Sequence, residues 1–407
     1  MSFFYFMAFS QDPGIRFEKG LSWQDILSKA KTENKYVFVD CYTTWCGPCK
    51  YMARNIFPLK ETGDALNPKF ISVGMQLDTT AHDSDTVKGE YADAHMIMTN
   101  YDIRAFPTYL FFNPQGILVH RALGSTDAAH FISFTEDALH EDRQYYSLIS
   151  KYRNRNNKDS MLLESLGHQA IDNGDPALAD SVLNDWFSII KNPYTKERLE
   201  MIAQITRKST DPGFDLFYKN TARIDKIKKP DFAETVVMNV IIKENQSITA
   251  LFKTNADTPE WSRIAEEIKT RYGSEYAHRS ITWVKVPYYK KEKNWNLYGS
   301  SLVAYLKEYG AYLEAQELNN YAWEIFEYCT GPDDLAVGLS CSNRSITANE
   351  KPNPGFMDTY ANLLYKSGRT AEAIAKETEA LNLSEPSQRQ PLQESLDKMK
   401  AGQKTWD

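Results

Sequence analysis

Cys46 and Cys49 are separated by two residues and lie where a short apolar run gives way to a helical pattern. The run at residues 37–42 predicts a buried strand, and the residues from Cys46 onward predict a helix. A cysteine at a helix N-terminus lies where the helix dipole and the unpaired backbone N–H groups favour negative charge, so the thiolate of Cys46 is favoured. Cys49 lies one turn further along, within reach of Cys46 and more shielded from solvent. The pair predicts a redox centre with Cys46 as nucleophile and Cys49 as resolving thiol.

The two residues between the cysteines shape the ring that a disulfide would close. Gly47 allows the turn without side-chain conflict, and Pro48 suits the first helical turn, where its missing N–H removes no hydrogen bond. The same cysteine spacing also occurs in zinc sites and in structural disulfides. Zinc requires more ligands, and the sequence contains no second such pair and no two histidines at the spacing of helical ligands. We therefore favour redox chemistry without a metal.

Residues 45–50, Trp-Cys-Gly-Pro-Cys-Lys, resemble the active site of the thioredoxin family. Residues 101–112 resemble the family's segment that leads into the cis-proline strand, which makes Pro107 the cis-proline facing the disulfide. A cis bond before proline costs far less than any other cis peptide bond, and it would expose the backbone of Phe106 for pairing with an extended substrate. The resemblance implies substrate contacts at Trp45, Gly47, Pro48, Phe106, Pro107 and Gly124. It also implies exchange with protein disulfides and no bound cofactor.

Asp40 lies inside the predicted strand and matches the family's buried carboxylate. Burial would raise its pKa and make it a proton acceptor for Cys49 through water. The sequence departs from the family in two ways. The lysine that many thioredoxins carry near this carboxylate is replaced by Gly74 or Met75. Residues 79–100 are longer than in a minimal thioredoxin, and of two interpretations, a substrate groove or a longer helix, we favour the longer helix.

The elements that must position these residues can be read from periodicity. Apolar positions between residues 21 and 30 recur at helical spacing, with Ser22 as N-cap. Residues 70–77 predict a strand, residues 108–112 and 118–122 predict a hairpin, and residues 127–140 predict a closing helix. The expected fold of residues 11–142 is therefore the α/β thioredoxin fold, a central mixed sheet flanked by helices.

Residues 143–407 predict an all-α domain, with Gly, Pro and Asn between successive helices. Small residues recur at a spacing that resembles tetratricopeptide repeats, most clearly at residues 354–383. Such an array either binds a partner or client, or packs against the thioredoxin domain, and both interpretations stay open. Five tryptophans of this part are expected in the core: Trp186, Trp261, Trp283, Trp295 and Trp323.

The composition and the first ten residues limit the possible partners and the cellular location of the protein. The 407 residues carry a net charge of −7 with both signs mixed, so no nucleic-acid partner is expected. Residues 1–10 resemble a truncated signal peptide and are too short to span a bilayer, which predicts a periplasmic or otherwise extracytoplasmic protein without an integral membrane segment. A cytoplasmic location is the alternative, because no Lys or Arg precedes the apolar run.

The other cysteines and the histidines are assigned structural roles. Cys41 follows Asp40 on the strand, so its side chain should face the opposite side as a buried, inert thiol. Cys329 and Cys341 are compatible with a disulfide or with free thiols. The histidines are scattered, and we expect surface positions for His82, His95 and His120.

These observations predict an exported thiol:disulfide oxidoreductase that works in the reducing direction, since Gly47-Pro48 resembles the dipeptide of reducing thioredoxins. Its expected partners are protein disulfide substrates, an electron-donating thiol reductase and a protein bound to the helical domain. The alternative is an interaction or scaffold protein in which the thioredoxin domain is a redox-sensitive or inert docking module.

Overall fold

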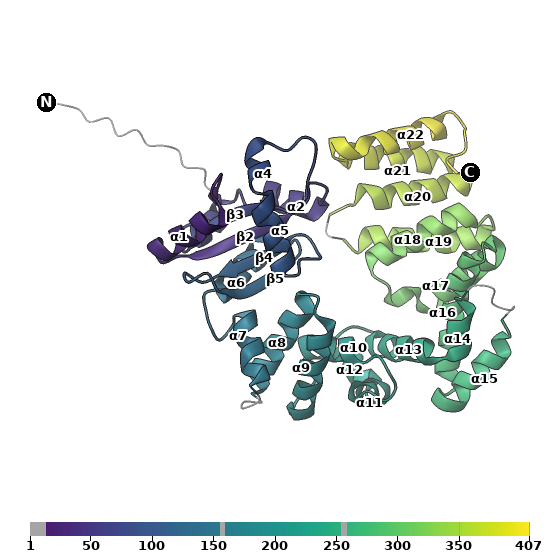
Figure 1. Ribbon diagram of the computed structural model, residues 1–407. Coiled ribbons are helices and arrows are strands. Elements are labelled where there is room, and N and C mark those ends of the chain that lie inside the picture. The colour runs from purple at the N-terminus through teal and green to yellow at the C-terminus, as the bar shows by residue number, and fades with distance from the viewer. Residues whose placement is uncertain (1–13, 155–158, 254–258, 350, 407) are drawn as a thin grey trace. The chain divides into compact units, whose positions relative to one another are not determined.

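The computed structural model of the protein describes residues 14–154, 159–253, 259–349 and 351–406. The chain divides into two compact units, Met1–Ile205 and Thr206–Asp407. The first unit contains the β-sheet and also the helices that follow it up to residue 205 (Figure 1). The change to all-helical structure near residue 142 is therefore a different boundary from the division into compact units. The predicted signal segment at residues 1–10 lies outside the described residues.

A five-stranded mixed sheet forms the centre of the first unit. Its spatial order is β1-β3-β2-β4-β5, in which β1, β3 and β2 run parallel and β4 is antiparallel to both of its neighbours. The central strand β2 is buried along most of its length, as the apolar run predicts. The strands are β1 (Phe17–Glu18), β2 (Tyr36–Tyr42), β3 (Phe70–Gln76), β4 (Thr108–Phe112) and β5 (Leu118–Leu123).

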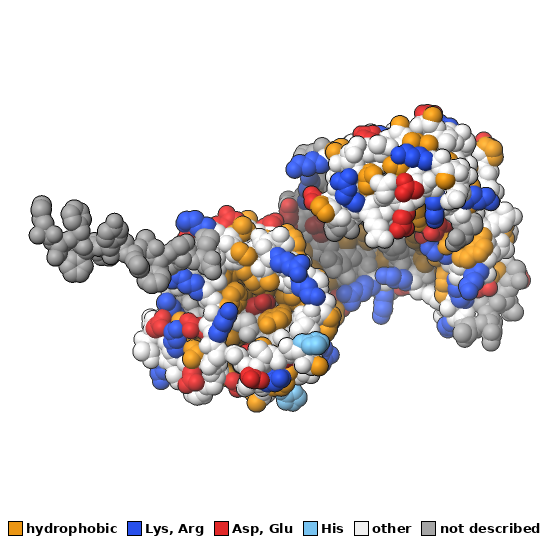
Figure 2. Space-filling model, turned by 90° about the horizontal axis from the view of Figure 1, so that it is seen from above, with side chains coloured by type: hydrophobic (Ala, Val, Ile, Leu, Met, Phe, Trp, Pro, Cys, Tyr) orange, Lys and Arg blue, Asp and Glu red, His pale blue; other side chains and the backbone are white. Residues whose placement is uncertain are grey.

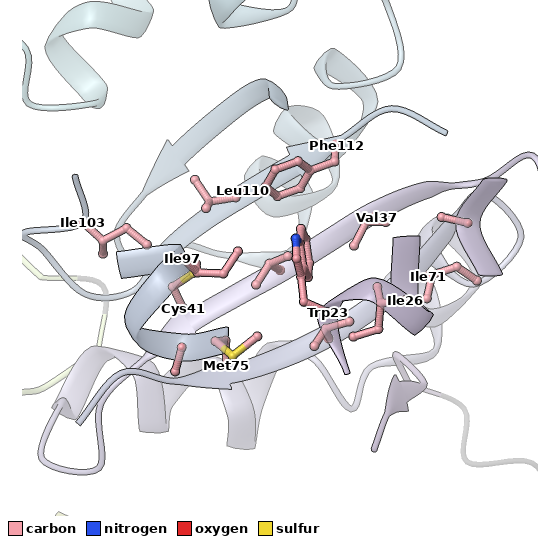
Figure 3. Packing of buried hydrophobic residues seen from close by; sticks show 14 residues of the cluster. Trp23, Ile26, Val37, Cys41, Ile71, Met75, Ile97, Ile103, Leu110 and Phe112 are labelled. Carbon is pink, nitrogen blue, oxygen red and sulfur yellow. The ribbon is translucent and has the colours of Figure 1, made fainter. Parts of the chain in front are cut away.

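Helices cover both faces of this sheet and give it two separate cores. Because side chains alternate along a strand, Cys41 and Asp40 point to opposite faces. The Cys41 face packs against α1 (Trp23–Glu33) and α5 (Tyr91–Asn100), and Trp23 meets Phe112 edge to face at 5.0 Å (Figure 3). The Asp40 face packs against the π-helix η1 (Met52–Ile56), α3 (Lys60–Leu66) and α6 (Ala128–Asp137). This arrangement confirms the thioredoxin-type α/β fold.

The predicted N-cap of the first helix is confirmed, and the helix predicted at residues 127–140 spans Ala128–Asp137. The Ser22 hydroxyl caps α1 by accepting a hydrogen bond from the Asp25 N–H, and Asp127 caps α6 in the same way through the His130 N–H. Asn34 ends α1 in the left-handed conformation, with φ 52°.

Helices from beyond residue 142 complete the first unit. They are α7 (Tyr145–Arg153), α8 (Ser160–Asp172), α9 (Pro176–Ile189) and α10 (Lys196–Ile205). Helix α7 packs on β5, and the Tyr145 N–H donates a hydrogen bond to the His120 Nδ1 at 3.0 Å. Helices α8 and α9 approach so closely that a methyl group on Gly167 would overlap the Leu183 side chain. The small residue read from the sequence is thus required by the packing of this pair.

The second unit is all-helical in its described residues. Residues 354–383 form a helix pair in which Ala361 and Ala373 are fully buried and Gly368 turns the chain with φ 81°. The helix pair is confirmed, and its tetratricopeptide character stays a prediction. The helices are α11 (Pro212–Lys219), α12 (Thr221–Ile227), α13 (Phe232–Glu244), α14 (Gln246–Leu251), α15 (Trp261–Tyr272), α16 (Ser274–Lys291), α17 (Trp295–Tyr309), α18 (Ala315–Tyr328), α19 (Pro332–Thr347), α20 (Pro354–Lys366), α21 (Thr370–Leu383) and α22 (Arg389–Lys400).

Two expectations about single residues are wrong. His120 is buried rather than exposed, because α7 covers its strand, and burial lowers its pKa to about 3. Trp295 is 38% exposed and stacks on Tyr328 at 4.3 Å instead of lying in a core. His82 and His95 are exposed as expected.

Two further features concern the cysteines and the membrane. Cys329 and Cys341 are both buried free thiols, so they are not paired with each other. Among the residues that the structure describes, no helix combines the length and apolar composition needed to cross a membrane.

Candidate active site

Cys46 and Cys49 form a disulfide at the start of α2 (Gly47–Tyr51). Cys46 is the N-cap of this helix, and its Sγ accepts a hydrogen bond from the Cys49 N–H at 3.1 Å. Pro48 lies in the first turn, where no backbone donor is lost. Helix α2 continues directly into the π-helix η1, whose Met52 and Ile56 are buried on the Asp40 face. The helix N-terminus and the Cys49 N–H are therefore placed to stabilise a thiolate on Cys46 once the disulfide is reduced.

A carboxylate distant in sequence fixes the loop before Cys46. The Thr44 N–H donates a hydrogen bond to the Asp78 Oδ1 at 2.9 Å, and the Thr44 hydroxyl donates to the Asp78 Oδ2. The Cys46 N–H donates to the Thr43 carbonyl oxygen at 3.2 Å. Sequence reasoning missed Thr44 and Asp78, because their pairing depends on β2 and β3 lying side by side and has no local signal.

Trp45 and Phe106 connect the disulfide loop with the proline segment. The Trp45 side chain is 68% exposed, and its ring meets the Phe106 ring edge to face at 5.8 Å. The Phe106–Pro107 peptide bond is cis. The Pro107 carbonyl oxygen accepts a hydrogen bond from the Gly124 N–H at 2.9 Å, and Gly124 has φ 86°, which favours glycine. The structure thus brings the predicted substrate-contact residues of three loops together around an exposed aromatic ring.

Asp40 is a buried carboxyl group on the neighbouring strand. It is 7% exposed, and within the described residues its Oδ1 has no hydrogen-bond partner. Burial raises the pKa of Asp40 to about 7, in the direction expected from the sequence. The strand register places Tyr109 and Gly74 on either side of it, so Gly74 occupies the position opposite Asp40 where the family's lysine was sought. Asp40 therefore has no neighbouring cation on β3 to hold its charge.

A cavity of about 500 Å³ reaches Asp40 from the side of the longer segment at residues 79–100. That segment forms two helices, α4 (Asp85–Gly89) and α5, rather than one longer helix. Residues of the first helix and its flanks face the cavity, so the segment does more than lengthen a helix. The lining residues are Phe17, Glu18, Lys19, Asp40, Tyr42, Ala53, Phe57, Gly74, Ser84, Thr86, Val87 and Glu90.

Asp83 holds the longer segment in place, and sequence reasoning did not identify it. Its carboxylate accepts hydrogen bonds from the Thr80 N–H at 2.8 Å, from the Tyr91 hydroxyl at 2.6 Å and from the Gln76 side-chain amide at 3.0 Å. The Thr80 hydroxyl donates a further bond at 2.6 Å. These donors lower the pKa of Asp83, with the Thr80 hydroxyl as the largest cause. The wall of the cavity is therefore tied to the end of β3.

Cys41 lies on the other face of β2 and takes no part in this site. Its side chain is buried in the core formed with Ile97, Leu110 and Met75 (Figure 3). Burial raises the pKa of the Cys41 thiol well above its usual value, and the charge of Asp40 adds to the shift. This buried position agrees with the prediction that Cys41 is an inert thiol.

Comparisons with known proteins agree with the fold and the cysteine pair. Residues 23–139 match a family model described as a thioredoxin-like domain. The chain is 34% identical to thioredoxin Y of Oryza sativa subsp. japonica, over 29% of this chain and 58% of that protein. It is 33% identical to the thiol:disulfide interchange protein DsbD of Colwellia psychrerythraea, over 26% of this chain and 16% of that protein. A thioredoxin-like protein of Synechocystis sp. is 36% identical, over 24% of this chain and 76% of that protein.

The similarity is limited to part of the chain and to part of the longer relatives. The chain spans 58% of the length of the rice protein and 16% of the length of the Colwellia protein. Among solved structures, the solution structure of a proposed disulphide-isomerase from Bacteroides thetaiotaomicron is 32% identical, with a TM-score of 0.27 over 32% of this chain and 97% of that chain. The helical second unit lies outside the residues that the family model matches.

Proposed function

The chain belongs to the thioredoxin-like family of thiol:disulfide oxidoreductases through residues 23–139, and from this premise we propose that it is an exported reductase of protein disulfides. The observation that carries the proposal is Cys46 as the N-cap of α2, paired with Cys49 and next to the exposed ring of Trp45. A cysteine at a helix N-terminus, where the helix dipole favours the thiolate, beside a resolving cysteine is an arrangement suited to thiol:disulfide exchange.

In the reducing direction the reaction has two steps. The Cys46 thiolate attacks one sulfur of the substrate disulfide, which forms a mixed disulfide and releases the other substrate sulfur as a thiolate. Cys49 then gives up its proton and attacks the Cys46 sulfur, which releases the second substrate sulfur and leaves the Cys46–Cys49 disulfide. Two electrons pass from the cysteine pair to the substrate, and a thiol reductase must return them. No bound cofactor is part of this scheme.

Asp40 is the proposed acceptor of the Cys49 proton, through water. Its pKa of about 7 suits a group that must take up and release a proton near neutral pH. Support comes from Ala53, which is one helical turn beyond Cys49 and lines the same cavity as Asp40. The carboxyl group and the resolving cysteine thus belong to adjoining elements.

The surface for substrates is proposed around Trp45, Gly47, Pro48, Phe106 and Gly124. Gly47 and Pro48 are exposed beside the buried sulfurs, and Trp45 and Phe106 supply apolar surface next to them. We assign the helical second unit to binding a client or partner, and export rests on the apolar segment at residues 1–10.

Reduction of insulin with dithiothreitol as electron donor tests this proposal. Replacement of Cys46 by serine should reduce turnover to the uncatalysed background, because the attacking thiolate is lost. Cys49→Ser should instead trap protein clients as mixed disulfides that dithiothreitol releases. Cys341→Ala, which removes a buried free thiol from the second unit, is the matched control and should keep full activity. Wild-type activity in Cys46→Ser would favour the docking-module alternative.

A further inference from the structure

The cavity beside Asp40 has the size and the walls of a small-molecule site. Its volume of about 500 Å³ lies within the range of about 300–1,000 Å³ that is common for ligand pockets. Three aromatic side chains, Phe17, Tyr42 and Phe57, contribute to its lining. Figure 2 shows that hydrophobic side chains gather on the visible face of the first unit, with acidic side chains among them. The three lining rings give the cavity an apolar part that can accept a hydrocarbon body.

The charged lining of the cavity is mainly acidic. Asp40, Glu18 and Glu90 line it, together with the single cation Lys19. Glu18 already forms an ion pair with Lys29 at 2.6 Å. Asp40 differs from the other two acids because it is only 7% exposed. Its Oδ1 has no hydrogen-bond partner within the described residues. Asp40 is thus a buried carboxyl group that has no counter-ion among the described residues and that contributes to the wall of the cavity.

Tyr42 lies next to Asp40 on the same face of β2, and both residues line the cavity. The charges that surround Tyr42 therefore also act inside the cavity. Burial raises the pKa of the Tyr42 hydroxyl, and the carboxylates of Asp40, Glu90, Asp78 and Asp83 raise it further. All four charged groups that act on this ring are negative. A positive charge inside the cavity would be attracted by each of them.

We propose that this cavity binds a small organic cation, with its ammonium group on the Asp40 carboxylate and its apolar body against the Phe17 and Tyr42 rings. The ammonium group supplies the hydrogen bonds and the charge that Asp40 lacks. The aromatic rings favour a cation and its hydrocarbon part over water. This binding does not depend on the proposed thiol chemistry, since the cysteine sulfurs do not line the cavity.

Gly74 provides the space for the ligand. A methyl group on Gly74 would lie 3.6 Å from the Tyr42 ring and 3.9 Å from the Phe17 ring, which are ordinary contact distances. The backbone at this position therefore tolerates a side chain, and a longer one would occupy the cavity. Gly74→Leu is thus a second way to remove the site without changing any charge.

Calorimetric titration of the full-length oxidised protein with benzylammonium tests the proposal, with benzyl alcohol as the neutral comparator of similar shape. We expect saturable benzylammonium binding below about 10 mM and binding of benzyl alcohol at least about tenfold weaker. Asp40→Asn and Gly74→Leu should each weaken benzylammonium binding by about tenfold or more. Asp64→Asn, at an exposed carboxylate of α3, is the matched control and should leave binding unchanged.

Three results would overturn the proposal: no saturable binding of benzylammonium, equal binding of benzyl alcohol, or unchanged binding in both cavity variants. Insulin reduction is measured on the same preparations. Binding without insulin reduction would count against the proposed function alone, and insulin reduction without binding would count against the cation site alone.

Discussion

The two faces of the central sheet differ although they share the same strands. On the Cys41 face, Val37, Val39 and Cys41 pack into a closed apolar core. On the Asp40 face, Phe38 packs into a core with Met52 and Ile56, whereas Asp40 and Tyr42 of the same strand line a cavity. The Cys41 face stabilises the fold through an apolar core. The Asp40 face is less stable, because it buries a carboxyl group that has no counter-ion among the described residues. The predictions below test this division, from the largest expected effect to the smallest.

The largest loss of stability is expected on the Cys41 face. Trp23→Ala removes a buried ring that packs on Phe112 and should lower the free energy of unfolding by about 3–5 kcal/mol. Because Trp23 lies on the face away from the disulfide, insulin reduction per folded molecule should stay unchanged. Urea unfolding monitored by far-UV circular dichroism gives the first quantity, and the insulin assay at low temperature gives the second. A large activity loss in the folded variant would show that the faces are not independent.

At alkaline pH, Asp40→Asn should raise the free energy of unfolding above that of the wild type, which is the opposite of the effect of Trp23→Ala. The folded-state pKa of Asp40 is about 7, above the value of the unfolded chain, so the folded protein holds this proton more tightly. Its stabilising contribution is complete below the unfolded pKa and is lost as the pH rises through about 7. The wild type should therefore lose up to about 4 kcal/mol between pH 4 and pH 8, and Asp40→Asn should remove that part of the slope.

Denaturant unfolding at a series of pH values measures this difference, with Asp64→Asn as the control at an exposed carboxylate. In the same variant, resolution of a mixed disulfide by Cys49 should slow by about 10²-fold, because the proposed proton acceptor is gone. A variant that is more stable but slower would support the contrast between the faces. Identical pH slopes in Asp40→Asn and the wild type would contradict it.

The sequence predicts those parts of this contrast that depend on local spacing. Cys46, Cys49 and Pro107 belong to short motifs, and the alternation along residues 37–42 correctly separates Asp40 from Cys41. Contacts between distant elements carry no such signal. The hydrogen bond from Thr44 to Asp78 can form only when β2 and β3 pair. The division of residues 79–100 into two helices depends on the hydrogen bonds that Asp83 accepts.

The burial of His120 also depends on a contact between distant elements that the local sequence does not predict. Its strand position alone fits either a surface or a buried residue, and the difference comes from α7, which lies beyond the predicted domain boundary and packs on β5. The sequence of residues 118–122 holds no information about what covers that strand. Sequence reasoning therefore predicted the cysteine pair that the structure joins in a disulfide, and it missed the residues that hold this pair through tertiary contacts.

A smaller loss of stability is expected from a polar change in the closed core. Cys41→Ser places a hydroxyl group in a fully buried apolar cluster, which should cost about 1–3 kcal/mol. Cys41→Ala is the matched control, since it removes the sulfur without adding a polar group. Both variants should reduce insulin at the wild-type rate once folded, which would separate this thiol from the redox chemistry. A rate loss shared by both variants would instead make Cys41 a third participant.

The smallest change in stability is expected at Trp45, which belongs to neither core. Its ring is 68% exposed and contacts the Phe106 ring only by its edge, and an aromatic pair of this kind contributes about 0.5–1.5 kcal/mol. Trp45→Ala should therefore lower the free energy of unfolding by no more than about 1 kcal/mol. The effect on protein substrates should be larger, with KM for insulin raised and the reaction of Cys46 with a small disulfide unchanged, because the ring is proposed to contact the substrate rather than the sulfur. Tyr51→Ala, at an exposed aromatic side chain of α2, controls for the general loss of apolar surface and should leave KM unaltered. If Trp45→Ala slowed both substrates equally, the ring would act on the disulfide itself, and the substrate surface would have to be placed elsewhere on the Asp40 face.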